Sequence, residues 1–376
     1  MPSKKRLSYI PYFIIIFAIL LNVIARFSLS FCEFHLFNIF PLITTPYAWF
    51  MSLFPFSVGE LMLYAAAILL ITLFIGGFIC LFRARSKFIR FYRAYAKVCL
   101  WLAAIFFLIM TLNCFILFHC APFTSYYPIG GKVAQGREYG LREIAVLRDY
   151  IVENANRLAE ELERNEKGYL IYEGDMIKQA QYEMRRLGLE FGRLAGYYPR
   201  PKPLLLSNFF SQQFMMGYFF PFSMEANYNA SMYIVNKPMT MCHELAHVKG
   251  FMFEDEASFI AFLAGAGSED DFFRYSAYMS VLSFVERDFL NLLGNDPVTY
   301  REHVKISDLV RRDDIFLTAE AWELVERNAI FSTDLVREIS NEIVEVNLTI
   351  NGVSDGRQSY GRVVRLLLMY YDGILY

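Results

Sequence analysis

Histidine is scarce in this chain, with five among 376 residues. Six scattered cysteines include no Cys-x-x-Cys pair, so no disulfide framework is indicated. Net charge is only −2, which gives a nucleic-acid partner no electrostatic support. No internal repeat or low-complexity segment is visible. The informative features that remain are long apolar runs and a few spaced polar residues.

Apolar residues make up 56% of the chain and its mean hydropathy is +0.31, too apolar for an ordinary soluble protein. Three uncharged runs are long enough to cross a bilayer: residues 7–25, 61–82 and 98–118. Buried core helices are the alternative, but three runs of this length favour membrane spans. A signal peptide is the other interpretation of the first run, yet Arg26 follows it instead of a small-residue cleavage site. We therefore expect a membrane domain over residues 1–119, with a lipid bilayer as partner.

The loop between the second and third runs indicates orientation. It carries six basic residues and no acid: Arg83, Arg85, Lys87, Arg90, Arg93 and Lys97. Positive loops stay in the cytoplasm, so the N-terminus is expected inside the cell and residues 120–376 outside the cytoplasm. The expected location is the cell membrane, crossed several times. The aromatic loop at 26–60 is then an interfacial or re-entrant segment, or it packs against the other domain.

The rest of the chain alternates helical patterns with one extended region. Residues 204–236 are rich in Phe, Tyr and small polar residues, which is typical of short strands. Helices are expected at about 139–165, 173–195, 269–294, 317–329 and 358–372. The expected fold class is a multi-pass α-helical membrane anchor plus a mostly α (α+β) extracytoplasmic domain with a small sheet.

Two of the five histidines fall in an HExxH pattern that runs from His243 to His247. Residues four apart lie on one helix face, so both imidazoles can reach one metal ion. Glu244 projects beside them, where a carboxylate can take a proton from a metal-bound water. Pro238 can start this helix and Gly250 can stop it. The pattern predicts a zinc site, and the alternative is a helix with two satisfied core histidines.

A third ligand is expected just after the Gly250 turn, where Glu254, Asp255 and Glu256 follow one another. We expect Glu256 to be that ligand, because it opens an apolar helix that can pack against the first and point back at the metal. Glu254 is the alternative ligand. A third interpretation is that these acids only form a favourable negative cluster at a helix N-terminus.

The pattern resembles known families. HExxH followed by Glu-Ala-Ser at 256–258 is similar to the gluzincin metallopeptidases, in which that glutamate is the third zinc ligand. More closely, the chain resembles the bacterial membrane HExxH proteins called domain of unknown function 3810. The matching stretches are 54–60, 127–129, 220–227, 241–262 and 359–362. The resemblance implies a membrane-bound zinc peptidase with a zincin-like domain, and it names no substrate.

We therefore expect zinc as cofactor, with His243, His247 and Glu256 as its ligands. Glu244 is the expected general base in the hydrolysis of peptide bonds by a metal-activated water. The expected partner is a peptide or protein substrate. Four residues are candidate transition-state donors, in an order that stays open: Tyr360, His303, Arg362 and Tyr228.

Two rival functions follow from the same residues. One is a non-catalytic, membrane-anchored sensor or binding domain with a structural zinc site. Glu244 argues against it, because a structural site needs ligands but no base. The other is a peptidase that cuts within the membrane. The charges over residues 236–256 argue against that, because such a site would lie in an apolar span.

Overall fold

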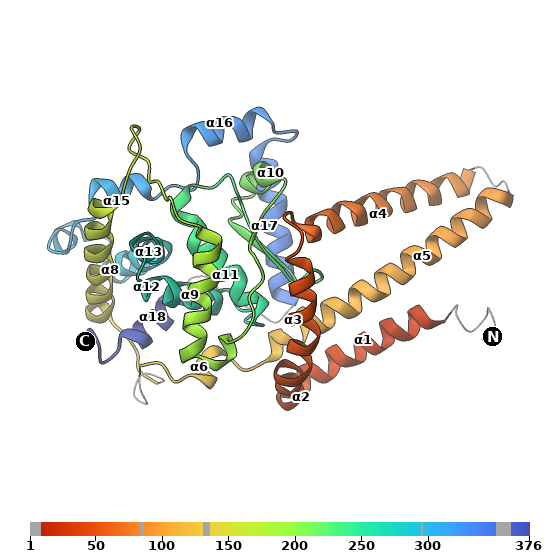
Figure 1. Ribbon diagram of the computed structural model, residues 1–376, viewed down its shortest axis with the longest axis horizontal. Coiled ribbons are helices and arrows are strands. Elements are labelled where there is room, and N and C mark those ends of the chain that lie inside the picture. The colour runs from red at the N-terminus through yellow and green to blue at the C-terminus, as the bar shows by residue number, and fades with distance from the viewer. Residues whose placement is uncertain (1–8, 83–85, 131–135, 295, 351–361) are drawn as a thin grey trace. The chain divides into compact units, whose positions relative to one another are not determined.

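The computed structural model describes residues 9–82, 86–130, 136–294, 296–350 and 362–376. Over these ranges the chain is mostly helical, with one small sheet (Figure 1). It forms two compact units. The first comprises Met1–Cys120 together with Phe220–Glu225, and the second comprises Ala121–Phe219 and Ala226–Tyr376.

The first unit is built from apolar helices, several of them long. They are α1 (Ile10–Phe27), α2 (Leu29–Phe34), α3 (Phe40–Met51), α4 (Val58–Phe82) and α5 (Ser86–Met110). In Figure 1, α5 lies beside both α1 and α4, and it packs against both. Three segments are long and apolar enough to cross a membrane: Ile10–Phe27, Val58–Phe82 and Lys87–His119. The expectation of three helices of this kind is confirmed.

The third of these segments begins earlier than the apolar run that marks it. Helix α5 starts at Ser86, so Lys87, Arg90 and Arg93 lie on its first turns and not in a loop. Their charges interrupt the apolar pattern, so the third uncharged run of the sequence begins only at residue 98. The aromatic segment at 26–60 is also largely helical, as α2, a π-helical turn at His35–Ile39, and α3.

A short segment from far along the chain completes the first unit. The buried Glu225 carboxylate accepts hydrogen bonds from the backbone N–H groups of Val58 (3.1 Å) and Gly59 (2.5 Å). The first N–H groups of a helix have no partner inside it, so Glu225 caps α4. Two more hydrogen bonds join this segment to helices of the same unit: Tyr47 hydroxyl to Phe222 carbonyl and Asn113 side chain to Pro221 carbonyl, each 2.9 Å.

The second unit is a helical body around α13. Its longer helices are α8 (Leu141–Glu161), α9 (Met176–Glu190), α11 (Lys237–Val248), α12 (Glu254–Ala266), α13 (Asp271–Leu293), α16 (Ala319–Arg327), α17 (Thr333–Ile350) and α18 (Val363–Tyr371). Shorter ones are α6 (Phe123–Tyr126), α10 (Ser207–Gln212), α14 (Pro297–Tyr300) and α15 (Asp308–Asp313). Helix α13 contacts α8, α11, α12 and α18, so the core lies around it (Figure 1).

The ends of α13 follow from its sequence. Asp270 caps its start by accepting a hydrogen bond from the Phe273 N–H at 3.0 Å. Gly294 ends it in the left-handed conformation, with φ of +67°, which glycine adopts without strain. The observed bounds therefore lie within two residues of the expected 269–294.

A three-stranded sheet supplies the extended region. Its strands are β1 (Lys202–Pro203), β2 (Gly217–Phe220) and β3 (Glu225–Tyr228), in the order β1-β3-β2. Strand β1 runs parallel to β3, with Lys202 opposite Asn227. Strand β2 therefore forms one edge of the sheet. The end of the expected 204–236 region is not a strand: Ile234–Asn236 forms a 3-10 turn that leads into α11.

Candidate metal centre

Helix α11 carries the HExxH pattern. Pro238 lies in its first turn, where its missing N–H removes no helical hydrogen bond. Gly250 follows its end with φ of +87°, and the Gly250 N–H donates to the His247 carbonyl at 2.9 Å. The chain then turns and starts α12 at Glu254, and the two helices pack against each other.

Three side chains of α11 and α12 converge on one point. His243 Nε2 lies 2.9 Å from Glu254 Oε2 and 3.1 Å from His247 Nε2, and His247 Nε2 lies 3.6 Å from the same carboxylate oxygen. Ligand atoms bound tetrahedrally at zinc distances are about 3.4 Å apart. The three donors therefore have the chemistry and the spacing of a zinc ligand set, and they are the metal-capable cluster among the described residues.

Both imidazoles are held through their other nitrogen. His247 Nδ1 lies 2.6 Å from the Phe251 carbonyl, which can only accept, so Nδ1 carries a proton, and in the neutral imidazole Nε2 is the atom that offers a lone pair. His243 Nδ1 lies 3.2 Å from the Ser258 hydroxyl. Such outer hydrogen bonds fix the tautomer and orientation of metal-binding histidines. The surroundings of the cluster thus fit a metal site better than a pair of ordinary core histidines.

The expected third ligand, Glu256, does not lie in this cluster. Its Oε1 accepts a hydrogen bond from the Phe123 backbone N–H at 2.6 Å. Burial raises the pKa of Glu256 to about 7, although the Phe123 N–H favours the charged form. Residues two apart on a helix are about 200° apart around its axis, so Glu254 and Glu256 face opposite sides. Glu254, the first residue of α12, faces the histidines. The geometry therefore favours Glu254 as the third ligand.

Glu244 lies beside the donors and is 5% exposed. It forms no hydrogen bond or ion pair with any residue that the structure describes. Gly217 at the start of β2 approaches it closely: a Cβ there would lie 2.5 Å from Glu244 Oε1 and 2.7 Å from Thr240 Cγ2. Only glycine lets the β2 backbone come this near to the carboxylate. Gly217 could not be foreseen from the sequence, since no local pattern signals such a long-range approach.

The charges of the cluster are strongly coupled. Burial opposes ionisation of Glu254, but the two imidazoles outweigh burial and hold its pKa well below the usual range. Burial also opposes the charge on His247, yet Glu254 raises the pKa of His247 to about 9. The pKa of His243 is lowered, chiefly by burial. Burial raises the pKa of Glu244 to about 8, with His247 opposing. Without a metal, the site therefore holds a proton where a cation would bind.

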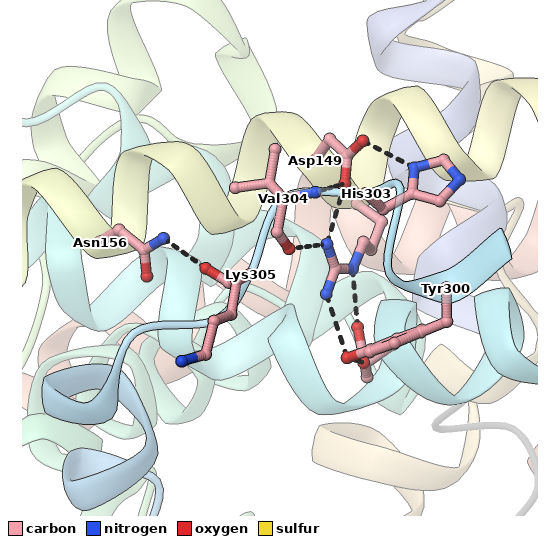
Figure 2. Close-up of polar contacts among 8 residues, drawn as sticks. Asp149, Asn156, Tyr300, His303, Val304 and Lys305 are labelled. Atoms are coloured by element: carbon pink, nitrogen blue, oxygen red, sulfur yellow. Dashed lines mark hydrogen bonds and ion pairs between the residues drawn. The ribbon is translucent and has the colours of Figure 1, made fainter. Parts of the chain in front are cut away.

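The candidate transition-state donors lie elsewhere or outside the described residues. Figure 2 shows His303 directed at Asp149 of α8, with Nδ1 and Oδ2 2.8 Å apart, and its ring packs edge-on against Phe289. Tyr228 packs against the buried cluster of Met232, Leu317 and Val325. Arg362 pairs with Asp255 at 3.3 Å. Tyr360 lies outside the described residues.

Comparisons with known proteins place the whole chain in context. No curated protein and no solved structure matches it. A family model described as "Protein of unknown function (DUF3810)" matches residues 36–368, which cover most of both compact units and include the donor cluster. The chain therefore belongs to the DUF3810 family of proteins of unknown function.

Proposed function

We propose that this protein is a membrane-anchored, zinc-dependent peptidase whose active site lies between α11 and α12. One observation carries the proposal. His243, His247 and Glu254 meet as a three-donor cluster, and Glu244 lies buried beside them without taking part in it. This combination offers both a ligand set and a separate base.

The number of donors favours a catalytic over a structural site. Structural zinc sites usually have four protein ligands, whereas catalytic sites have three and leave one position for water or substrate. The cluster has three members among the described residues. A bound zinc would lower the pKa of a coordinated water and polarise the scissile carbonyl.

The remaining steps fall to the chain's own residues. Glu244 accepts the proton of the attacking water and then passes it to the leaving amine. The Phe251 carbonyl and the Ser258 hydroxyl keep the two imidazoles oriented throughout. Burial of Glu244 keeps it from being solvated by bulk water, so its oxygen atoms stay available to the reacting groups.

Strand β2 supports a peptide as the substrate. It is an edge strand, and Gly217 brings its backbone against Glu244. An extended peptide can add to such an edge through main-chain hydrogen bonds, which brings its backbone close to the base. Strand β3 cannot play this part, because it lies in the middle of the sheet.

The anchor and its orientation complete the proposal. Three helices of sufficient length and apolarity support several membrane crossings. The basic residues from Arg83 to Lys97, which include the first turns of α5, support a cytoplasmic N-terminus, and hence an active site outside the cytoplasm.

Replacement of the base tests the proposal. Full-length Glu244→Gln protein should keep its zinc, measured by elemental analysis, because amide and carboxylate are alike in size. It should lose about 10²–10⁴-fold in hydrolysis of a broad peptide library followed by mass spectrometry, because the amide cannot accept the proton. His243→Ala is the control that should lose both zinc and hydrolysis. Wild-type protein that holds zinc and cleaves nothing would instead support the sensor or binding alternative.

A further inference from the structure

A second polar site lies in the same unit, next to the first turn of α12. It is a cavity of about 570 Å³. Its walls come from α6, α12 and α18: Thr124, Ser125, Asp255, Arg362, Arg365, Leu366 and Met369. None of these residues belongs to the donor cluster, and the proposed hydrolysis uses none of them.

One face of α18 divides the cavity into a charged and an apolar part. Arg362, the N-cap residue of α18, is followed by Arg365, Leu366 and Met369 at i+3, i+4 and i+7, so the four lie along one side of the helix. The two arginines come first, at the N-terminal end. Leu366 and Met369 follow and are buried. A ligand in this cavity therefore meets guanidinium groups at one end and an apolar wall at the other.

The polar groups of the cavity have capacity for an anion. Arg365 forms no ion pair or hydrogen bond with any residue the structure describes. The hydroxyls of Thr124 and Ser125 likewise have no hydrogen-bond partner in the described part of the chain. Arg362 is paired with Asp255 at 3.3 Å, and its side chain is still 44% exposed. Two guanidinium groups and one carboxylate leave a net charge of about +1.

We propose that this cavity binds the free C-terminal carboxylate of a peptide substrate, with the apolar last side chain against Leu366 and Met369. A single carboxylate matches the net charge of the cavity. A phosphate monoester carries about −1.5 to −2 charges, and the Asp255 carboxylate would repel the excess. The hydroxyls of Thr124 and Ser125 can donate to the same carboxylate.

The assignment to a peptide rests on the proposed function, whereas the anion site itself does not. Asp255 directly follows Glu254 in α12, and consecutive Cα atoms are about 3.8 Å apart. A chain end held by Arg365, beside Asp255, would therefore bring a peptide bond near the C-terminus toward the donor cluster. The enzyme would then shorten peptides from their C-terminal end.

Binding to paired peptides tests this assignment without any hydrolysis. Full-length Glu244→Gln protein is incubated with random octapeptides in two forms, one with a C-terminal carboxylate and one with a C-terminal amide, and retention is measured by mass spectrometry. A hydrogen bond to a charged group contributes about 1.5–3 kcal/mol, so the acid form should be retained about 10–100-fold better. Arg365→Gln in the same background should abolish the preference, and Arg365→Lys should keep part of it.

The control is Arg311→Gln, which changes an exposed arginine of α15 that does not line the cavity and should keep the full preference. Equal retention of acid and amide forms, or a preference that survives Arg365→Gln, would overturn the assignment. Displacement of the peptides by decanoate would also overturn it, because the site would then be one for an alkyl carboxylate. Displacement by glycerol phosphate would overturn it too, because the site would then be one for a phosphate. Because the readout is binding, wild-type protein that cleaves nothing would contradict the proposed function and leave this result standing.

Discussion

At the scale of single residues, Glu254 is the group on which the cluster depends. Its carboxylate touches both imidazoles, and it is the source of the raised pKa of His247. A buried carboxylate is tolerated only with such partners, since burial alone favours its neutral form. The same negative charge that holds a proton on His247 is the one a divalent cation would meet.

Substitution of the two glutamates should separate their roles. Glu254→Ala should weaken zinc binding by at least about 10–100-fold, because it removes a ligand; losses of that size already follow when only a ligand's outer partner is removed. Glu256→Ala should keep most of the zinc, because that carboxylate binds the Phe123 N–H. Zinc titration of both full-length variants gives the comparison. Loss of zinc from Glu256→Ala but not from Glu254→Ala would instead identify Glu256 as the third ligand.

Zinc affinity should also depend on pH. The His247 pKa of about 9 lies above its ordinary 6.5, so the proton's stabilising effect is complete below about 6.5 and is lost as pH rises through about 9. Zinc needs the neutral imidazole and must displace that proton. Affinity measured against a competing chelator should therefore rise between pH 6.5 and 9, by at most about tenfold per unit. In Glu254→Gln the steep region should move to lower pH, and a flat wild-type profile would contradict the coupling.

Which of these residues could be foreseen depends on the range of the interaction. The four-residue spacing of His243 and His247 places both on one helix face, and this needs only helix geometry. The choice between Glu254 and Glu256 depends on where α12 begins, and a shift of two residues turns the other glutamate toward the histidines. The approach of Gly217 to Glu244 depends on the fold of the sheet, which neither the sequence around Gly217 nor the sequence around Glu244 indicates.

At the scale of elements, a buried arginine joins the segment after α14 to α8 and α13. The Arg148 side chain is fully buried, and it donates to Glu286 and Asp149 at 2.8 Å each and to the Val304 carbonyl (Figure 2). His303 binds the same aspartate. The segment is therefore held by one network of charged hydrogen bonds, and His303 belongs to this network and not to the donor cluster.

Removal of this arginine should be costly. Arg148→Met leaves Glu286 and Asp149 without their buried partner, and breaking a buried pair typically lowers stability by about 3–5 kcal/mol. Arg157→Met is the matched control on the same helix. Its ion pair with Glu161 is about half exposed, and such pairs contribute only about 0.3–0.5 kcal/mol. Thermal unfolding of both variants in detergent should show a much larger shift for Arg148→Met, and equal shifts would argue against the network.

At the scale of the whole molecule, the proposed orientation decides which compartment supplies the substrate. The basic residues from Arg83 to Lys97 predict that a reporter fused near residue 90 behaves as cytoplasmic. A reporter fused after residue 120 should behave as extracytoplasmic. Alkaline phosphatase and green fluorescent protein fusions report the two sides. The reverse pattern would move the donor cluster into the cytoplasm.

The capping of α4 by Glu225 limits how the chain can be divided for study. A fragment that starts at residue 121 keeps Phe220–Glu225 but lacks Val58, Gly59 and the other partners of that segment. In such a fragment the Glu225 carboxylate would lose the Val58 and Gly59 N–H groups, and the Phe222 carbonyl would lose the Tyr47 hydroxyl. No single cut in the chain separates the two units, because Phe220–Glu225 belongs to the first unit. Aggregation of such a fragment would therefore say nothing about the donor cluster. Biochemistry on this protein should therefore begin with the intact chain.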